Sequence, residues 1–407
     1  MTVKLHWYLP THGDGRTLLQ AGAATQARLE HRRADGEPGG RPATIDYLAQ
    51  VARAAEQAGF DAALTPTGTW CDDAWLTTAA LSQVVERLRF LVAFRPGTLS
   101  PTLAAQQAAT FQRITGGRLL LNIVTGGEDA EQRRFGDDLA KDERYARTDE
   151  FLTILRGAWA GEPFDFRGRH LWAEGALALG VERPPEIYFG GASDAALRVA
   201  AKHADVALTW GVPPVDAGRF VERVRELAAE HGRAPRFGVR LHVVSRDDEE
   251  RAWQDAEALI ADADDAAIDA AQAQLGRAQA VGQQRQAALH GGRRDRASLE
   301  IHPHLWAGVG LLRGGAGTAL VGTHEQVADL IEEYHDHGLT ELILSGYPHV
   351  EEAYAFGEGV VPVLRRRGLL DPAQPTGIAT GGASPAPALQ IPGIVAGGAS
   401  PAAVPAS

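Results

Sequence analysis

The sequence predicts an α/β fold, a (β/α)8 TIM barrel with insertions, on three observations. Short apolar runs alternate with helical patterns over most of the chain, and eight of these runs have the length and composition of strands. Strands that alternate with helices pair in parallel, and eight is the number at which such a sheet closes into a barrel. The GxGxxG pattern expected after the first strand of an open doubly wound sheet is absent. The open sheet is therefore the less favoured alternative.

The expected elements follow one another in a regular order. The strands lie at Leu5–Leu9, Phe60–Pro66, Leu88–Phe94, Leu119–Val124, Glu186–Phe189, Val206–Trp210, Phe237–Val244 and Glu341–Ser345. The helices lie at Thr44–Ala58, Asp73–Val85, Thr102–Thr115, Glu143–Ala160, Asp194–Ala204, Pro214–His231, Glu249–Ala263, Thr323–His337 and Glu351–Arg366. Gly59 ends the first helix, and the third begins after Pro101 and ends at Gly116. Proline fits a first helical turn, and glycine fits the left-handed conformation that ends a helix.

Composition and charge exclude several classes of protein. Apolar residues make up 44% of the 407 residues and charged residues 23%, which is the balance of a globular protein with a sizeable core. The net charge of −12 gives no basic field for nucleic acid or an anionic membrane surface. Met1–Pro10 lacks a signal-peptide pattern, and no segment is suited to span a bilayer. The single cysteine, Cys71, excludes an intrachain disulfide, so we expect a cytoplasmic protein.

One barrel domain is expected over residues 1–370, with two enlarged regions. Residues 16–41, rich in Gly, Arg and Ala, are expected to form an enlarged loop after the first strand, and residues 264–322 an insertion that contains a lid. Residues 371–407 are rich in Pro, Gly and Ala, a composition that cannot bury a core. We therefore expect a flexible tail there.

Polar residues follow the predicted strands, where the active sites of such barrels lie. In order they are Thr11 and His12, Thr67 and Cys71, Arg95, Thr125, Gly190 to Ser193, Thr209 and Trp210, Arg240 and His242, and Tyr347 and His349. Each alone also suits a structural role, such as a buried thiol for Cys71 or a core histidine for His242. Their shared placement favours a functional site.

The run YFGGASD at Tyr188–Asp194 passes from a strand through two glycines into a helix. Such a turn offers free backbone N–H groups and the positive end of a helix, which suit a phosphate monoester. The alternative is an ordinary turn in which Ser193 caps the helix, and Ser193 can serve both roles. No metal site is expected, because His335 and His337 point in different directions on their helix and no other group has a known ligand spacing.

The glycine-rich run LWAGVGLLRGGAGTALVG at Leu305–Gly322 contains one cation, Arg313. Its backbone is permissive enough to open and close, and its apolar residues could cover a site from water. A passive flexible loop is the alternative.

Several runs of the sequence, taken together, match a known pattern. They are Tyr8–Gly15 (YLPTHGDG), Pro66–Trp75 (PTGTWCDDAW), Leu119–Gly126, Tyr188–Asp194, Thr209–Pro214 (TWGVPP), Phe237–Val243 (FGVRLHV), Val281–His290 (VGQQRQAALH), Leu305–Gly322 and Ser345–Tyr354 (SGYPHVEEAY). In this order they resemble the reduced-FMN-dependent alkanesulfonate monooxygenases of the bacterial luciferase-like family. The resemblance covers about residues 1–370, apart from the loop at 16–41.

This resemblance implies oxidative cleavage of a carbon–sulfur bond in organosulfur assimilation. An alkanesulfonate, dioxygen and reduced FMN would give an aldehyde, sulfite, water and oxidised FMN. The reduced FMN would be a diffusible cosubstrate supplied by a separate NAD(P)H-dependent FMN reductase. The resemblance also implies a homo-oligomer, a tetramer.

The resemblance assigns roles to residues of the predicted site. Arg240, His242, Tyr347 and Arg313 would be catalytic, and Trp210 and His349 would line the substrate site together with both arginines. A sulfonate is anionic at physiological pH and suits the forked, permanently charged guanidinium. The cofactor residues would be His12 and Cys71 near the flavin ring, with Thr125, Tyr145 and Ser193 at its tail and phosphate.

Some points stay open on the sequence alone. Arg240 and His242 are both candidates for removing the carbon-bound proton. Lys141 stands where we expect His in relatives, which puts one phosphate contact in doubt although lysine also suits phosphate. The alternatives are a luciferase-like oxidoreductase that acts on another organosulfur compound or uses a deazaflavin, and a flavin-binding protein without catalysis. The intact set of Arg240, His242, Tyr347 and Arg313 disfavours the second.

Overall fold

The computed structural model describes residues 2–24, 39–180 and 182–371, and all of them belong to one compact unit. The predicted tail after Asp371 and the middle of the predicted loop at 16–41 lie outside the described residues. None of the described helices combines the length and the apolar composition needed to cross a bilayer.

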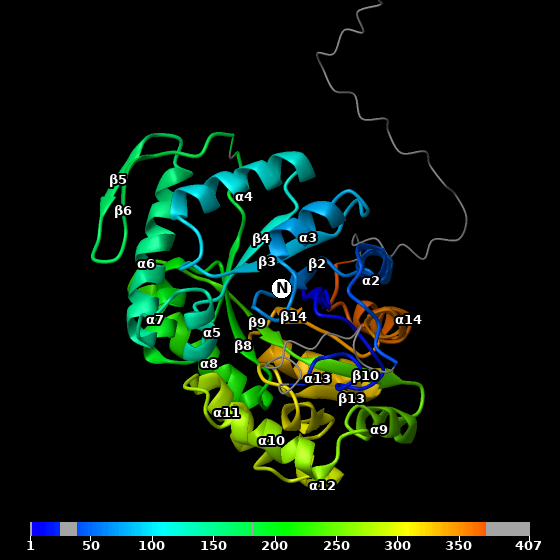
Figure 1. Cartoon of the computed structure of the whole chain (residues 1–407). Coiled ribbons are helices and arrows are strands. Elements are labelled where there is room, and N and C mark those ends of the chain that lie inside the picture. Colours follow the sequence, from blue (N-terminus) through cyan, green and yellow to red (C-terminus); the bar gives the residue numbers. More distant parts are fainter. Residues whose placement is uncertain (1, 25–38, 181, 372–407) are drawn as a thin grey trace, which may run out of the picture. The chain divides into compact units, whose positions relative to one another are not determined.

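Parallel strands form a closed barrel in the order β1-β14-β9-β8-β7-β4-β3-β2 (Figure 1). Their bounds are β1 Lys4–Tyr8, β2 Ala62–Thr65, β3 Arg89–Phe94, β4 Leu119–Ile123, β7 Ile187–Gly190, β8 Val206–Trp210, β9 Arg236–Arg240 and β14 Glu341–Ile343. The first strand closes the barrel, because β1 pairs with β2 on one side and β14 on the other. The predicted (β/α)8 barrel is confirmed, and the open sheet is wrong.

Helices follow the strands and surround the barrel (Figure 1). They are α2 Ile45–Ala58, α3 Ala74–Leu81, α4 Pro101–Thr115, α5 Asp129–Arg134, α6 Lys141–Ala158, α7 Asp194–His203, α8 Pro214–Ala229, α13 His324–Asp336 and α14 His349–Arg366. Local chemistry sets their ends. Thr44 caps α2, which stops at Gly59 with a φ of 88°, and Ser100 caps α4 just before Pro101.

Two apolar cores hold the barrel together. The inner one fills the barrel with side chains such as Tyr8, Leu120 and Leu208. The outer one lies between strands and helices and includes Phe90 and Phe151, both almost fully buried. The barrel is thus a packed body with its polar residues at the strand ends, as this fold requires.

A buried carboxylate stands at the amino-terminal end of the barrel. Glu341, the first residue of β14, lies 2.7 Å from His6 Nε2 and 2.8 Å from the Tyr188 hydroxyl. Burial alone would raise the pKa of Glu341, but His6, Arg236 and Lys4 outweigh burial and lower it to about 2. These partners allow a charge to remain inside the fold.

The predicted seventh strand, Phe237–Val244, is two strands in the structure. β9 ends at Arg240, and after Leu241 the chain continues as β10, His242–Arg246. β9 pairs with β8 inside the barrel, whereas β10 pairs in parallel with β13, Ala319–Thr323. The sequence does not reveal such a change of partner, because the chain is extended both before and after Leu241.

The insertion between β10 and α13 has more regular structure than the sequence predicts. Its elements are α9 Glu249–Ala258, α10 Asp265–Leu275, α11 Val281–His290, α12 Arg296–Leu299, β11 Glu300–His302, β12 Leu305–Trp306, the 3-10 helix η2 Gly308–Leu311, and β13. β10, β13, β12 and β11 form a second sheet. The glycine-rich run therefore begins and ends as strand, and its irregular part is residues 312–318.

The strands β5, Phe164–Arg167, and β6, Trp172–Ala176, were not predicted from the sequence. They form an antiparallel hairpin after α6 (Figure 1). β5 alternates over only four residues, FDFR, and most of β6 is exposed, including Trp172.

Candidate active site

The strands of the barrel are parallel, so their carboxyl ends meet at one end, the mouth. Arg240 ends β9, and Tyr347 and His349 follow the neighbouring β14. His242 opens β10, and Arg313 arrives from the insertion between η2 and β13. We call these residues the substrate group, and the structure brings them together.

Ser345 links Arg240 to His242. Its hydroxyl oxygen lies 2.7 Å from Arg240 Nη2 and 2.8 Å from His242 Nδ1. Arg240 Nη1 also donates to the main-chain oxygens of Leu241 and, at 3.3 Å, Ile343. Arg240 and His242 are both buried. These bonds fix the guanidinium in one orientation at the mouth.

The hydrogen bonds also determine the tautomer of His242. Its Nε2 lies 3.1 Å from the carbonyl oxygen of Ala316, which can only accept, so Nε2 carries the proton. Nδ1 is then the acceptor for the Ser345 hydroxyl. Burial, followed by the positive charges of Arg240 and Arg313, lowers the pKa of His242 well below its usual value. His242 is therefore a neutral imidazole at neutral pH, and both of its ring nitrogens are already bonded.

Arg240 and Arg313 place two positive charges around one aromatic ring. Their guanidinium carbons lie 5.0 Å and 6.0 Å from the centroid of the Tyr8 ring. Arg313 is buried, and its Nη1 donates to the carbonyl oxygens of Gly314 at 3.3 Å and Ala316 at 3.0 Å. Two fixed guanidinium groups suit an anion with several oxygens.

Tyr347 lies between two imidazoles. Its ring centroid is 5.7 Å from that of His242 and 4.9 Å from that of His349. The Tyr347 hydroxyl and His349 Nε2 are buried, and neither has a hydrogen-bond partner among the described residues. A bound molecule can supply the partner at such positions.

Tyr145 and Ser193 meet at the turn after β7. Burial raises the pKa of Tyr145 and outweighs a hydrogen bond with Ser193 that lowers it, so the phenol stays protonated and can donate. Ser193 caps α7 by accepting from the Ala196 N–H at 3.3 Å. A Cβ on Gly191 would lie 2.4 Å from Ala196 Cβ. The backbone therefore comes close to the start of the helix, which only glycine permits.

Thr125, His12 and Cys71 follow the strands β4, β1 and β2. Thr125 follows β4, with its hydroxyl 3.5 Å from that of Thr148 in α6. The ring of the buried His12 contacts the ring of Trp70 edge to face, with centroids 5.2 Å apart. Cys71 directly follows Trp70 in the sequence. The structure thus separates the predicted residues into two sides of one mouth. Their roles in binding and catalysis remain predictions.

Trp210 ends β8, between the two sides. A Cβ on Gly282 of α11 would lie 3.0 Å from its ring, and one on Gly315 would lie 3.9 Å away. The indole therefore packs beneath the insertion that carries Arg313.

The comparison with known families decides what kind of protein this is. A family model described as luciferase-like monooxygenase matches residues 4–341. The chain belongs to the luciferase-like monooxygenase family.

Solved structures share the fold of this luciferase-like monooxygenase. Riboflavin lyase RcaE, solved with modified FMN and riboflavin, is 19% identical, with a TM-score of 0.71 over 91% of this chain and 93% of that chain. EDTA monooxygenase EmoA from Chelativorans sp. BNC1 is 20% identical, with a TM-score of 0.70 over 92% and 96%. Long-chain alkane monooxygenase LadA is 19% identical, with a TM-score of 0.70 over 91% and 93%. At these identities the similarity concerns the fold.

Sequence reasoning missed two buried residues of this luciferase-like monooxygenase, Asp14 and Ser345. Asp14 accepts a hydrogen bond from His349, and Ser345 links the substrate group as described above. Both stand in runs that carry the family resemblance, after the first and the last barrel strand. Their position after a barrel strand is the sequence feature that could have identified them.

A second unpredicted group surrounds Arg95, which follows β3. Its Nη2 donates to Glu131 at 2.6 Å, whereas its Nε and Nη1 and the amide nitrogen of Gln132 are buried with no partner among the described residues. A Cβ on Gly126 would lie 2.7 Å from Arg95 Nη1 and 2.4 Å from Gln132 Nε2, so the two donors converge. They suit an acceptor oxygen of a bound molecule. No sequence pattern predicts Glu131 and Gln132, because α5 is too short to show a period.

Lys141, the departure from the expected pattern, begins α6 of the luciferase-like monooxygenase. Its Nζ donates to the main-chain oxygen of Gln279 at 3.1 Å. Lys141 thus ties α6 to the segment before α11.

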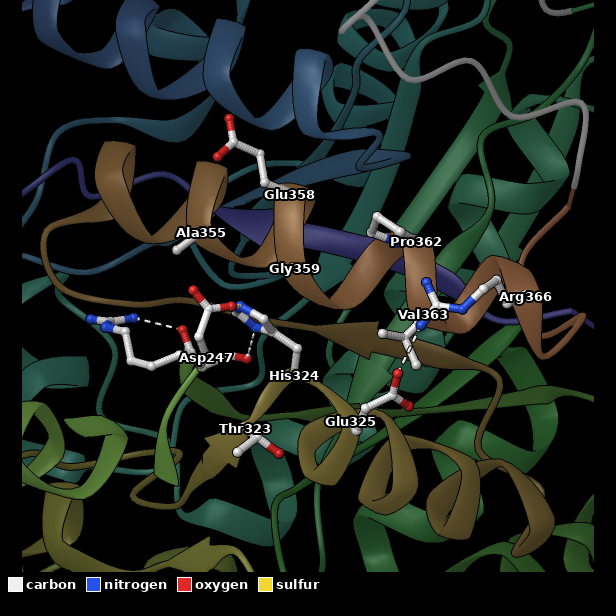
Figure 2. A pocket seen from close by; sticks show the side chains of 12 residues that line it. Asp247, Thr323, His324, Glu325, Ala355, Glu358, Gly359, Pro362, Val363 and Arg366 are labelled. Atoms are coloured by element: carbon white, nitrogen blue, oxygen red, sulfur yellow. Dashed lines mark hydrogen bonds and ion pairs between the residues drawn. The ribbon is translucent and has the colours of Figure 1, made fainter. Parts of the chain in front are cut away.

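Two cavities lie apart from the substrate group of this luciferase-like monooxygenase. One, of about 610 Å³, lies between α14 and the start of α13, where Figure 2 shows His324 next to Asp247. His324 Nδ1 lies 2.6 Å from the Ser245 hydroxyl. The other, of about 480 Å³, lies among α6, α7 and α8 and has Tyr145 in its wall. No residue of the substrate group lines either cavity.

In the described part of the chain, no cluster of three or more His, Cys, Asp or Glu side chains could hold a metal ion.

Proposed function

We propose that this luciferase-like monooxygenase uses reduced FMN and dioxygen to cleave the carbon–sulfur bond of alkanesulfonates, with an aldehyde, sulfite, water and oxidised FMN as products. Reduced FMN supplies the two electrons of the reaction. A separate NAD(P)H-dependent reductase delivers it, and the enzyme acts as a homotetramer, by the resemblance of the sequence.

The paired guanidinium groups are the observation that supports an anionic substrate. Arg240 and Arg313 both lie within 6.0 Å of the Tyr8 ring centroid, beside the neutral His242. The ionised sulfonate would accept from the two arginines, while the orphan Tyr347 hydroxyl offers a further polar partner. An uncharged alkane would leave two buried cations without an anion, which disfavours such a substrate.

The strand ends of the barrel outside the substrate group fit FMN. Tyr145, Ser193 and the close turn at Gly191 would hold the phosphate, since they combine hydroxyl donors with the amino-terminal end of α7. The orphan donors of Arg95 and Gln132 match the carbonyl oxygens of a flavin ring. The structures of riboflavin lyase RcaE and of a type II Baeyer-Villiger monooxygenase of this fold contain modified FMN and FMN.

The neutral His242 and the arginines have separate tasks in this proposal. Arg240 and Arg313 bind and orient the sulfonate, and the segment 312–318 excludes water from above. His242 has both nitrogens bonded, so it orients Arg240 through Ser345 in the described arrangement.

The proposal is tested by sulfite release. The purified protein is mixed with FMN, an FMN reductase and NADPH, and given alkanesulfonates of increasing chain length, a long-chain alkane and EDTA. Sulfite and aldehyde should form in equal amounts from sulfonates only, and neither should form without the reductase. Product from the alkane or EDTA with no sulfite from any sulfonate would contradict the assignment. Light scattering tests the tetramer.

A further inference from the structure

Asp14 is a fully buried carboxylate whose two oxygens are both saturated. Oδ1 accepts from the Gly15 N–H at 2.8 Å and from His349 Nδ1 at 2.9 Å. Oδ2 accepts from the His349 main-chain N–H at 2.7 Å and from the Tyr47 hydroxyl. Four donors around one buried carboxylate stabilise its charged form.

The charge of Asp14 determines the tautomer of His349. Burial alone would raise the pKa of Asp14, but the charge and hydrogen bonds of His349, with the Tyr47 hydroxyl, outweigh burial and lower it. An ionised carboxylate is only an acceptor, so His349 Nδ1 carries a proton. The free position of the imidazole is then Nε2, which is buried and has no partner among the described residues.

His349 Nε2 differs in this respect from the nitrogens of His242. Both nitrogens of His242 are bonded, to Ser345 and Ala316. The His349 ring lies against Tyr347, whose hydroxyl is likewise buried without a partner among the described residues. Two orphan polar atoms on neighbouring rings are placed for the same bound molecule.

A ring of contacts from three elements holds Asp14 in place. Its main chain pairs with Arg41, with N–H to oxygen distances of 2.9 Å and 2.7 Å. The Arg41 guanidinium binds the Glu351 carboxylate in the first turn of α14, and Tyr47 belongs to α2. The Trp7 indole N–H donates to the main-chain oxygen of His349 at 3.2 Å. Both the carboxylate and the imidazole are therefore anchored before any ligand binds.

We propose that Asp14 is a positioning residue, which fixes His349 with Nδ1 toward the carboxylate and Nε2 toward the reactants, so that His349 is the proton donor of the site. The proposal rests on the proposed function and deepens it. The negative carboxylate stabilises the imidazolium, and the proton on Nε2 passes to an oxygen atom of the bound reactants. The carbon-bound proton that the substrate loses restores it. The carboxylate itself stays ionised throughout.

Other charged and titratable groups face the pair from every neighbouring element. They are Tyr8 of β1, Arg41 beyond the loop, Tyr47 of α2, His242 of β10, Tyr347 after β14, and Glu351 of α14. Variants must therefore separate the effect of Asp14 from a general change of charge in this group.

The test compares Asp14→Asn with Glu351→Gln. Both remove one carboxylate from the same contact ring, but only Asp14 touches the imidazole. Asp14→Asn should lower kcat at least about tenfold and move the alkaline limb of the kcat profile to lower pH, because a neutral amide no longer stabilises the imidazolium. Glu351→Gln should leave the limb in place, and the KM for reduced FMN should change less than about twofold in both. Unchanged kcat and pH profile in Asp14→Asn would overturn the proposal.

A second measurement does not depend on turnover. In the whole protein labelled with 15N-histidine, with His349→Gln to assign the signal, the neutral His349 should be the Nδ1–H tautomer. Asp14→Asn should shift that signal, and Tyr47→Phe, which keeps the carboxylate, should retain the Nδ1–H tautomer. An Nε2–H tautomer in the wild type would overturn the proposal even if sulfite is released. A correct tautomer without sulfite release would contradict the proposed function alone.

Discussion

The imidazole of His242 stacks on the ring of Tyr347, with centroids 5.7 Å apart and planes inclined by 20°. The two residues come from different sheets: His242 opens β10 of the second sheet, and Tyr347 follows β14 of the barrel. Their contact therefore joins the insertion to the mouth. A substitution of either residue should therefore alter the packing of both the insertion and the mouth.

Arg240→Ala and His242→Ala should each lower turnover about tenfold to hundredfold while leaving the affinity for reduced FMN nearly unchanged. Both residues belong to the substrate group, whereas the Tyr145–Ser193 turn follows β7, which β8 separates from β9. A hydrogen bond to a charged group contributes about 1.5 to 3 kcal/mol. Steady-state sulfite release and anaerobic titration with reduced FMN measure the two quantities.

The matched control for the lost charge is Arg219→Ala, because Arg219 lies exposed on α8. It should change neither quantity. If flavin affinity falls as much as turnover in Arg240→Ala, then Arg240 does not belong to the substrate side.

Arg313→Lys should lose most of its sulfite release, about tenfold or more, although the charge is kept. Arg313 Nη1 donates to two carbonyl oxygens of its own segment, and the ammonium of lysine cannot make these bonds and also face an anion. The yield of sulfite per reduced flavin oxidised measures the effect. Arg293→Lys, at an exposed position of the same insertion, is the control. A near-normal yield in Arg313→Lys would remove Arg313 from the site.

Gly191→Ala should weaken the binding of reduced FMN about tenfold, whereas Gly190→Ala should have little effect. A Cβ at Gly191 would meet Ala196 Cβ at 2.4 Å and force the start of α7 to move, but a Cβ at Gly190 would find its nearest atom at 3.8 Å. Moving a close-packed helix end by even a few tenths of an ångström disturbs the N–H groups that suit a phosphate. Fluorescence titration distinguishes the two variants. Equal affinity in both would place the phosphate elsewhere.

Glu341→Gln should remove an acid-sensitive part of the stability. The pKa of Glu341 is lowered from an ordinary 4.5 to about 2, so the carboxylate stabilises the fold fully above pH 4.5, and this contribution is lost as the pH falls toward 2. The shift corresponds to about 3 kcal/mol. The unfolding free energy from urea titrations at pH 7, 4 and 3 should decrease less toward acid pH in the variant than in the wild type. An identical pH slope in both proteins would show that Glu341 is not ionised in the fold.

The barrel could be predicted because its strands are short apolar runs that stay in one environment. Val206–Trp210 has the same bounds in the sequence and in the structure. The end of β9 could not be predicted, because the backbone is extended on both sides of Leu241 while only the pairing partner changes. The hairpin of β5 and β6 was missed because its strands are short: the alternation of β5 covers only four residues, and most residues of β6 are exposed.

The residues of the mouth could be named from their position after strands, but their connections could not. Ser345 and Asp14 act on Arg240, His242 and His349 over more than 100 positions of sequence. The contacts exist because β14 lies between β9, which brings Ser345 to Arg240, and β1, which brings Asp14 to His349. The orphan amide of Gln132 depends in the same way on a short helix that has no pattern of its own.

At Leu241 the chain leaves the barrel and enters the second sheet, so the two arginines of the substrate group are held by different parts of the fold. Arg240 is held by the barrel, whereas Arg313 precedes β13 of the second sheet. Substitutions within residues 312–318, with Arg313 kept, should therefore change the space around Arg313 while leaving the barrel contacts of Arg240 in place. A combinatorial library confined to that segment is the economical way to redirect the enzyme toward longer or bulkier molecules.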